Sequence, residues 1–206
     1  MISNTVEASF ASGGLLLEGL LDERPGQRAV VLTHPHPLYG GDMYNSVVGA
    51  LAEAYGENGF TCLRMNFRGA GQSQGEYTDG PGEVQDVLAA MEFLKTRQKP
   101  ALHLAGYSFG AWICAQACGL APETPLVMVA PPVAFLDFSL VGPLPGLVFA
   151  AVGSHDGFAP VDAVTRAMAA WNPAAELEVI HGADHFFRLG LSALTQAVSR
   201  RLKSQT

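Results

Sequence analysis

The stretch of residues 101–118 reads ALHLAGYSFGAWICAQAC. It begins with a mostly apolar run typical of a buried strand, and from Phe109 onward it has a helical pattern of apolar residues. Between the two lies GYSFG, residues 106–110, which places a G-x-S-x-G pattern at a strand-to-helix turn. The following helix would direct its free N–H groups and its positive dipole end at Ser108. We therefore expect Ser108 to be a nucleophile rather than a chance serine in a glycine-rich turn.

The predicted nucleophile needs a base, and the sequence contains six histidines. A serine hydroxyl is a weak nucleophile until an adjacent base removes its proton, and a carboxylate orients that base. After a turn of this kind the usual chain order is serine, then acid, then histidine. His185 lies in GADHFF, residues 182–187, between the last predicted strand and the last predicted helix. We expect His185 to be the base, with His181 at the end of that strand as the alternative.

The acid is expected between the serine and the histidine in the chain. Asp156 lies in GSHDG, residues 153–157, directly after a predicted strand. In that loop its carboxylate would accept the Nδ1–H of His185, hold the tautomer and stabilise the imidazolium. Three other acids are weaker alternatives. Asp162 lies in a predicted helix, Asp184 is adjacent to the base, and Asp137 follows the preceding strand.

Two backbone N–H groups are expected to bind the oxygen that becomes negatively charged during attack. One belongs to Phe109, the residue after the nucleophile, and the other to THPHPLYGG, residues 33–41, after the third strand. Proline has no N–H, which leaves His36 as the first choice and Leu38 as the second. His34 and His36 lack a carboxylate or cysteine neighbour, so we expect no metal site there.

The rest of the chain alternates predicted strands with predicted helices. Strands are expected at 6–11, 15–21, 29–33, 61–67, 101–107, 126–130, 146–152 and 177–181, and helices at 44–55, 82–96, 109–118, 161–171 and 189–203. This alternation predicts an α/β fold with about eight mostly parallel strands, helices on both faces and an antiparallel edge at the first two strands. In such sheets the active site lies beyond the carboxyl ends of the strands, where all the candidates above are found.

One glycine-rich loop follows the fourth predicted strand and is a weak candidate for a phosphate site. It reads NFRGAGQSQG over residues 66–75, and its glycine spacing does not match the G-x-G-x-x-G dinucleotide pattern. We expect a tight structural loop beside the cleft, with Arg68 bonded to neighbouring carbonyls.

Composition limits the class of protein and its partners. The 206 residues are 49% hydrophobic and 15% charged, which favours a single folded domain over residues 1–206. A net charge of −7 gives no footprint for nucleic acid. Neither a signal peptide nor a membrane-inserted helix is expected. The three cysteines, Cys62, Cys114 and Cys118, are expected to be reduced core residues of a cytoplasmic protein, without bound metal.

Taken together, these motifs resemble the α/β-hydrolase superfamily over nearly the whole chain. HPHPLYGG at 34–41 and NFRGAGQSQG at 66–75 further resemble a group of small, cap-less bacterial predicted hydrolases related to dienelactone hydrolases. Two departures are visible: Pro35 replaces the glycine of the superfamily's His-Gly-x-Pro motif, and the nucleophile is serine where dienelactone hydrolases have cysteine. The resemblance therefore does not imply their lactone chemistry, and the choice between His36 and Leu38 stays open.

The interval 131–145 is too short for a multi-helix cap, so an open cleft is expected. Its apolar residues would line an acyl pocket or simply pack as a covering loop: Val133, Phe135, Leu136, Phe138, Leu140 and Val141. The expected function is a serine hydrolase that cleaves small or accessible carboxylic esters or thioesters through an acyl-enzyme on Ser108, with no cofactor. The alternatives are a peptidase, amidase or acyltransferase with the same three residues, or a non-catalytic binding protein on this fold.

Overall fold

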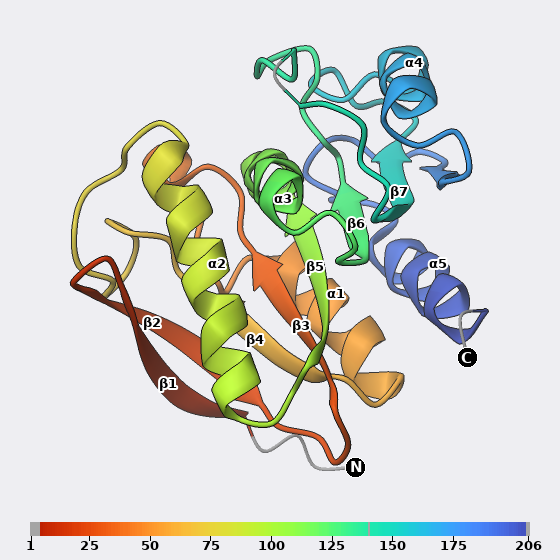
Figure 1. Ribbon diagram of the computed structural model, residues 1–206. Helices are drawn as coiled ribbons and strands as arrows, with labels where there is room; N and C mark the ends of the chain where they lie inside the picture. The colour runs from red at the N-terminus through yellow and green to blue at the C-terminus, as the bar shows by residue number, and fades with distance from the viewer. Residues whose placement is uncertain (1–4, 140, 205–206) are drawn as a thin grey trace.

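The computed structural model describes residues 5–139 and 141–204 (Figure 1). Its strands are β1 (Thr5–Ser12), β2 (Leu15–Asp22), β3 (Arg28–Thr33), β4 (Thr61–Met65), β5 (Ala101–Tyr107), β6 (Leu126–Val129), β7 (Leu147–Gly153) and β8 (Glu176–Ile180). Its α-helices are α1 (Ser46–Glu57), α2 (Pro81–Thr96), α3 (Phe109–Leu120), α4 (Val161–Trp171) and α5 (Leu191–Lys203), with a 3₁₀ turn η1 at Pro37–Tyr39.

The eight strands form one sheet in the order β1-β2-β4-β3-β5-β6-β7-β8. β1 pairs with β2 and β2 with β4 in antiparallel fashion, whereas every pairing from β4 through β8 is parallel. The predicted α/β fold with an antiparallel edge is therefore confirmed. The central strands are apolar on both faces, as parallel strands covered by helices must be.

Helices cover both faces of the sheet, as predicted. In Figure 1, α2 and α3 lie in front of the sheet and pack against each other, while α1 lies behind it and packs against α5. A single hydrophobic core runs through all these layers. The three cysteines are buried in it and form no disulfide.

The loops that follow β3, β5, β7 and β8 converge at the carboxyl edge of the parallel strands, because parallel strands all end at the same edge. The connection from β6 to β7 runs along this edge as well, and its described residues contain no helix that could form a lid. No helix within the described ranges is both long and apolar enough to cross a bilayer.

Most element boundaries differ from the prediction by one or two residues, and two of these shifts have a visible cause. The first helix begins at Ser46 instead of residue 44, because the side chain of Asn45 caps it by accepting a hydrogen bond from the N–H of Val47. The fourth strand ends at Met65, because Asn66 turns into the glycine-rich loop, where its side chain bonds to the N–H of Met43 and to the carboxylate of Glu18 on β2.

Candidate active site

Ser108 lies in the sharp turn between β5 and α3, where its backbone adopts φ 54° and ψ −118°. L-residues rarely adopt a positive φ, so this serine is held in a strained conformation. The turn is tight: a Cβ on Gly110 would lie 2.5 Å from Thr33 Oγ1 and 2.7 Å from the carbonyl oxygen of His34. Glycine at position 110 therefore allows β3 and α3 to approach closely enough to present Ser108 at the sheet edge.

Ser108, His185 and Asp156 form one hydrogen-bonded chain across three loops. Ser108 Oγ lies 2.9 Å from His185 Nε2, and His185 Nδ1 lies 2.8 Å from Asp156 Oδ2. All three side chains are buried. Since a carboxylate only accepts hydrogen bonds, Nδ1 carries the proton, and Nε2 is left free to accept from the serine hydroxyl. This geometry lets His185 take the proton of Ser108 while Asp156 orients the ring.

Further bonds hold the acid and the base in place. Asp156 Oδ1 accepts the backbone N–H groups of Phe158 and Ala159, each at 2.8 Å. The hydroxyl of Tyr107 donates to the carbonyl oxygen of His185 at 2.9 Å. Sequence reasoning did not identify Tyr107 as a support, although its place beside Ser108 in the turn was a signal.

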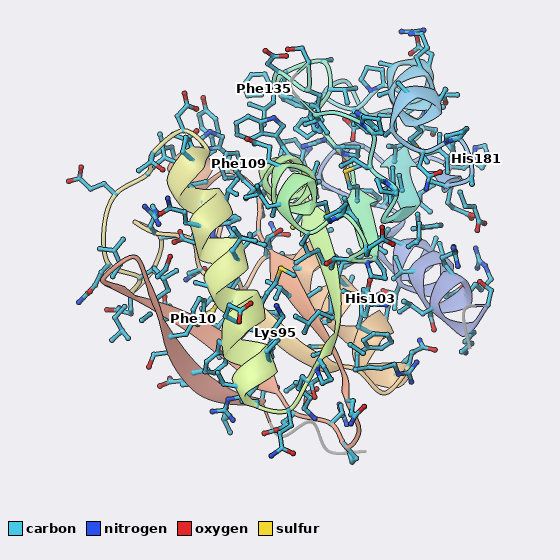
Figure 2. All side chains as sticks on the ribbon, in the orientation of Figure 1. Phe10, Lys95, His103, Phe109, Phe135 and His181 are labelled. Carbon is cyan, nitrogen blue, oxygen red and sulfur yellow. The ribbon has the colours of Figure 1, made fainter. Side chains whose placement is uncertain are left out.

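The alternative candidates lie elsewhere or have other partners. His181 is exposed at the end of β8, and Figure 2 shows it at the outer margin of the molecule, away from Phe109. The three alternative acids have other partners: Asp162 pairs with Arg166, Asp184 pairs with Arg188, and Asp137 accepts the N–H of Ser139.

His34 is a buried structural residue. Its Nδ1 lies 2.6 Å from the carbonyl oxygen of Pro35, and its Nε2 accepts the N–H of Phe67 at 3.1 Å. Burial lowers the pKa of His34 to about 4, so the ring stays neutral near pH 7. In the part of the chain that the structure describes, no three His, Cys, Asp or Glu side chains are grouped to hold a metal ion.

The two first-choice oxyanion donors flank the cleft beside Ser108. The backbone N–H groups of Phe109 and His36 have no hydrogen-bond partner within residues 5–139 and 141–204. The N–H of Leu38 instead donates to His36 Nδ1 at 3.3 Å, and the Leu38 side chain is exposed outside the cleft. The geometry therefore favours His36 over Leu38.

A cleft of about 450 Å³ opens directly over Ser108 and His185. Its walls are largely apolar: Tyr39, Phe109, Pro132, Phe135, Phe158 and Phe186. Among the described residues no Lys, Arg, Asp or Glu side chain lines it. Phe158 packs 4.7 Å from the His185 ring and 5.6 Å from Phe135, measured between ring centroids, so aromatic groups cover the histidine side of the cleft.

The β6–β7 connection supplies only part of the expected apolar lining. Phe135 and Leu136 line the cleft, and Figure 2 shows Phe135 on the same end of the molecule as Phe109. Val133, Phe138 and Val141 pack against the hydrophobic core and border a separate surface groove against α4, so for these three the packing alternative holds. Leu140 lies outside the described residues.

The prediction that Arg68 bonds to neighbouring carbonyls is wrong. Its guanidinium binds the carboxylate of Asp86 on α2 through two nitrogens, at 2.7 and 3.0 Å, instead of bonding neighbouring carbonyls. Asp86 is fully buried and also accepts from the Ser12 hydroxyl and the Arg68 N–H. A buried carboxylate needs such a charged partner, and this one ties the loop after β4 to α2.

Comparisons with known proteins bear on the family and on the fold. Residues 30–202 match the α/β hydrolase family. An uncharacterized protein of Rickettsia prowazekii is 36% identical over 186 residues, which cover 85% of this chain and 78% of that protein. An α/β serine hydrolase homologue from Coxiella burnetii superposes with a TM-score of 0.90 at 32% identity, covering 98% of this chain and 99% of the other.

A second solved structure bears on the missing lid. A serine hydrolase from Xanthomonas campestris, described as having no lid, superposes with a TM-score of 0.87 at 30% identity, covering 100% of this chain and 96% of the other. The family match, the sheet order and the serine turn all lead to one assignment: this chain belongs to the α/β hydrolase family.

Proposed function

We propose that the protein is a serine hydrolase that cleaves carboxylic esters or thioesters through an acyl-enzyme on Ser108. The observation that carries the proposal is the continuous chain from Ser108 Oγ through His185 to Asp156, at 2.9 and 2.8 Å. The similarity to the Coxiella burnetii and Xanthomonas campestris serine hydrolases supports it. A binding protein on the same fold would have no use for all three groups in this order.

In the proposed reaction, Ser108 Oγ attacks the ester carbonyl carbon while His185 Nε2 removes the hydroxyl proton. The N–H groups of Phe109 and His36 bind the oxygen that becomes negative, and Asp156 stabilises the protonated His185. The tetrahedral intermediate then collapses, and His185 gives its proton to the departing alcohol or thiol. Water, deprotonated by His185, attacks the acyl-enzyme in the same manner and releases the carboxylic acid with the serine restored.

The cleft favours uncharged substrates with apolar groups. Aromatic side chains such as Phe135 and Phe158 offer apolar contact, and among the described residues no Lys, Arg, Asp or Glu lines the cleft to pair with a charged substrate. With no helix over the cleft in the described part of the β6–β7 connection, water can reach the site, which favours hydrolysis over acyl transfer to another acceptor. The three buried free thiols support a reducing, cytoplasmic compartment.

The direct test is a pair of matched histidine variants assayed on 4-nitrophenyl butyrate and on a butyryl thioester. His185→Ala should lose at least about 10³-fold in kcat/KM, as should Ser108→Ala, because each removes a group that acts on the reacting atoms. His181→Ala, which changes an exposed histidine at a strand end, should retain wild-type activity. Wild-type protein that turns over neither ester, or a Ser108→Ala variant that remains active, would contradict the proposal.

Two measurements distinguish an ester hydrolase from an acyltransferase, peptidase or amidase: the effect of an added acceptor and the type of bond that is cleaved. An acyltransferase would release product faster when an alcohol or amine acceptor is added, and would form the corresponding ester or amide. A peptidase or amidase would cleave a butyryl anilide at a rate comparable with the ester. We expect hydrolysis that added acceptors do not accelerate, and an anilide rate far below the ester rate.

A further inference from the structure

The oxyanion donor proposed for the loop after β3 is held by side chains that no motif identified. The His36 ring packs against Phe109 and Tyr77, with ring centroids at 4.8 and 5.0 Å. Its Nδ1 accepts the Leu38 N–H at 3.3 Å, and its Nε2 lies 3.2 Å from the hydroxyl of Tyr77. That hydroxyl in turn donates to Asp79 Oδ1 at 2.9 Å.

These contacts determine which atom donates and which accepts in each hydrogen bond of the series. Because Nδ1 accepts from a backbone N–H, the proton of the neutral ring must be on Nε2. The single hydrogen of the Tyr77 hydroxyl is given to Asp79, so its oxygen is free to accept from His36 Nε2. The order is therefore Leu38 N–H to His36, His36 to Tyr77, and Tyr77 to Asp79. The ring orientation and its tautomer are both specified.

The far end of this chain is anchored by a buried carboxylate. Glu83, at 0% exposure in the first turn of α2, accepts from the N–H and the hydroxyl of Thr78 and from the N–H of Gly80, at 2.8 to 2.9 Å. Thr78 and Gly80 flank Asp79, whose own backbone has φ 58°. The segment that carries Tyr77 and Asp79 is thus fastened on both sides of Asp79 to the rigid start of a helix.

We propose that Tyr77 and Asp79 are positioning residues that fix His36, so that its backbone N–H points at the oxyanion on the Ser108 adduct. The inference rests on the proposed function, since it assigns a role within the same reaction. The His36 N–H is unpartnered among the described residues and lies in the cleft wall beside Phe109, whose N–H is likewise free. A donor must be aligned before reaction to stabilise developing charge, and a loop that carries it therefore needs fixed side-chain supports.

Variants that remove only the hydrogen bonds test this role. Tyr77→Phe keeps the ring contacts with His36 and Phe109 but deletes the hydroxyl. Asp79→Gly removes the carboxylate and tolerates the positive φ, whereas Asp79→Asn keeps an oxygen that accepts from Tyr77. Tyr44→Phe is the matched control, because Tyr44 is an exposed tyrosine outside the cleft lining.

Removing an oxyanion donor outright lowers kcat by about 10²–10³, so a donor that is only misaligned should cost about tenfold. Tyr77→Phe and Asp79→Gly should therefore lower kcat for 4-nitrophenyl butyrate about tenfold. Acylation and deacylation both build charge on the same oxygen, so both slow alike and KM should stay within about twofold. Asp79→Asn and Tyr44→Phe should resemble wild type.

A boronic acid provides the second readout, because its serine adduct is tetrahedral and places an anionic oxygen in the same site. Inhibition by phenylboronic acid should weaken by the same factor as kcat in Tyr77→Phe and Asp79→Gly, while urea unfolding remains close to wild type. Unchanged kcat in Tyr77→Phe would overturn the positioning role and leave the proposed hydrolase intact. A loss that appears in KM alone would also overturn it. A wild type that neither hydrolyses esters nor binds the boronate would overturn both.

Discussion

Backbone strain at Ser108 predicts that glycine there makes the protein more stable than alanine does, although both variants lack the nucleophile. Ser108 has φ 54° and ψ −118°, and a non-glycine residue held in such a region costs about 1–3 kcal/mol. Glycine adopts these angles without the clash. It also gives the unfolded chain more conformational freedom, which lowers the free energy of unfolding by about 0.4–1 kcal/mol. Both variants lose the same hydrogen bond to His185, so this term cancels when they are compared. The middle of these two ranges leaves the free energy of unfolding of Ser108→Gly about 1.3 kcal/mol above that of Ser108→Ala.

The assay is urea unfolding of the two variants side by side, with thermal unfolding as a check. For a chain of this length, 1 kcal/mol corresponds to a shift in Tm of about 2–4 °C. The matched control is Ala169→Gly, at an exposed position within α4. There glycine should lower the free energy of unfolding by about 1 kcal/mol, because a helix interior disfavours it. If Ser108→Gly is no more stable than Ser108→Ala, the turn is not strained and the reasoning fails.

Three further predictions concern the acid, the buried His34 with the half-buried His103, and the buried ion pair. Asp156→Asn should lower kcat by about 10³–10⁴, measured on a 4-nitrophenyl ester, because the amide oxygen stays with the two loop N–H groups and its NH₂ faces the histidine, which reverses the tautomer. Burial lowers the pKa of His34 and of His103 to about 4, so the unfolded chain binds protons that the folded chain does not. The contribution of each neutral histidine to the free energy of unfolding is therefore fully present above about pH 6.5 and decreases toward pH 4. Urea unfolding at pH 7 and at pH 4.5 should show a loss of about 2 kcal/mol per histidine. Asp86→Ala should cost about 3–5 kcal/mol in urea unfolding, because it leaves Arg68 part-buried without its carboxylate.

Each of these three predictions has a control variant or an outcome that would contradict it. His103→Gln should lose about 2 kcal/mol less than wild type between pH 7 and 4.5, and an identical loss would show that His103 does not contribute. Glu92→Ala removes an exposed carboxylate paired with Lys95 and should change stability by less than about 1 kcal/mol. An Asp86→Ala variant as stable as Glu92→Ala would contradict the structural role of the buried pair. An Asp156→Asn variant with wild-type kcat would remove Asp156 from the mechanism.

The fold and the three central site residues were predictable because both follow from local pattern and topology. Apolar runs alternating with helical periods predict parallel strands, and parallel strands end at one edge. Ser108, Asp156 and His185 each lie in the connection that follows a strand, so their location at one edge of the sheet follows from the order of strands and helices along the chain. The structure brings these three together and leaves His181 exposed at the strand end.

What could not be predicted depends on how irregular loops pack against each other. Tyr77 contacts His36 across 41 positions in the chain, and the link has no periodicity or motif. Arg68 binds the carboxylate of Asp86 where bonds to nearby carbonyls were expected, since only the packed structure shows that α2 passes over this loop. Phe135 and Phe138 are near neighbours in one apolar run, yet they line different hollows, because the run has no regular structure to assign its faces.

The most direct test of the central claim is labelling with a fluorophosphonate, followed by intact-mass measurement and peptide mapping, on wild type, Ser108→Ala and His185→Ala. We predict one adduct per wild-type chain, located on Ser108, no adduct on Ser108→Ala and strongly slowed labelling of His185→Ala, because only the assembled chain of three residues activates the hydroxyl. A folded wild-type protein that forms no adduct, or one labelled equally well after the Ser108→Ala change, would contradict the assignment of Ser108 as the nucleophile.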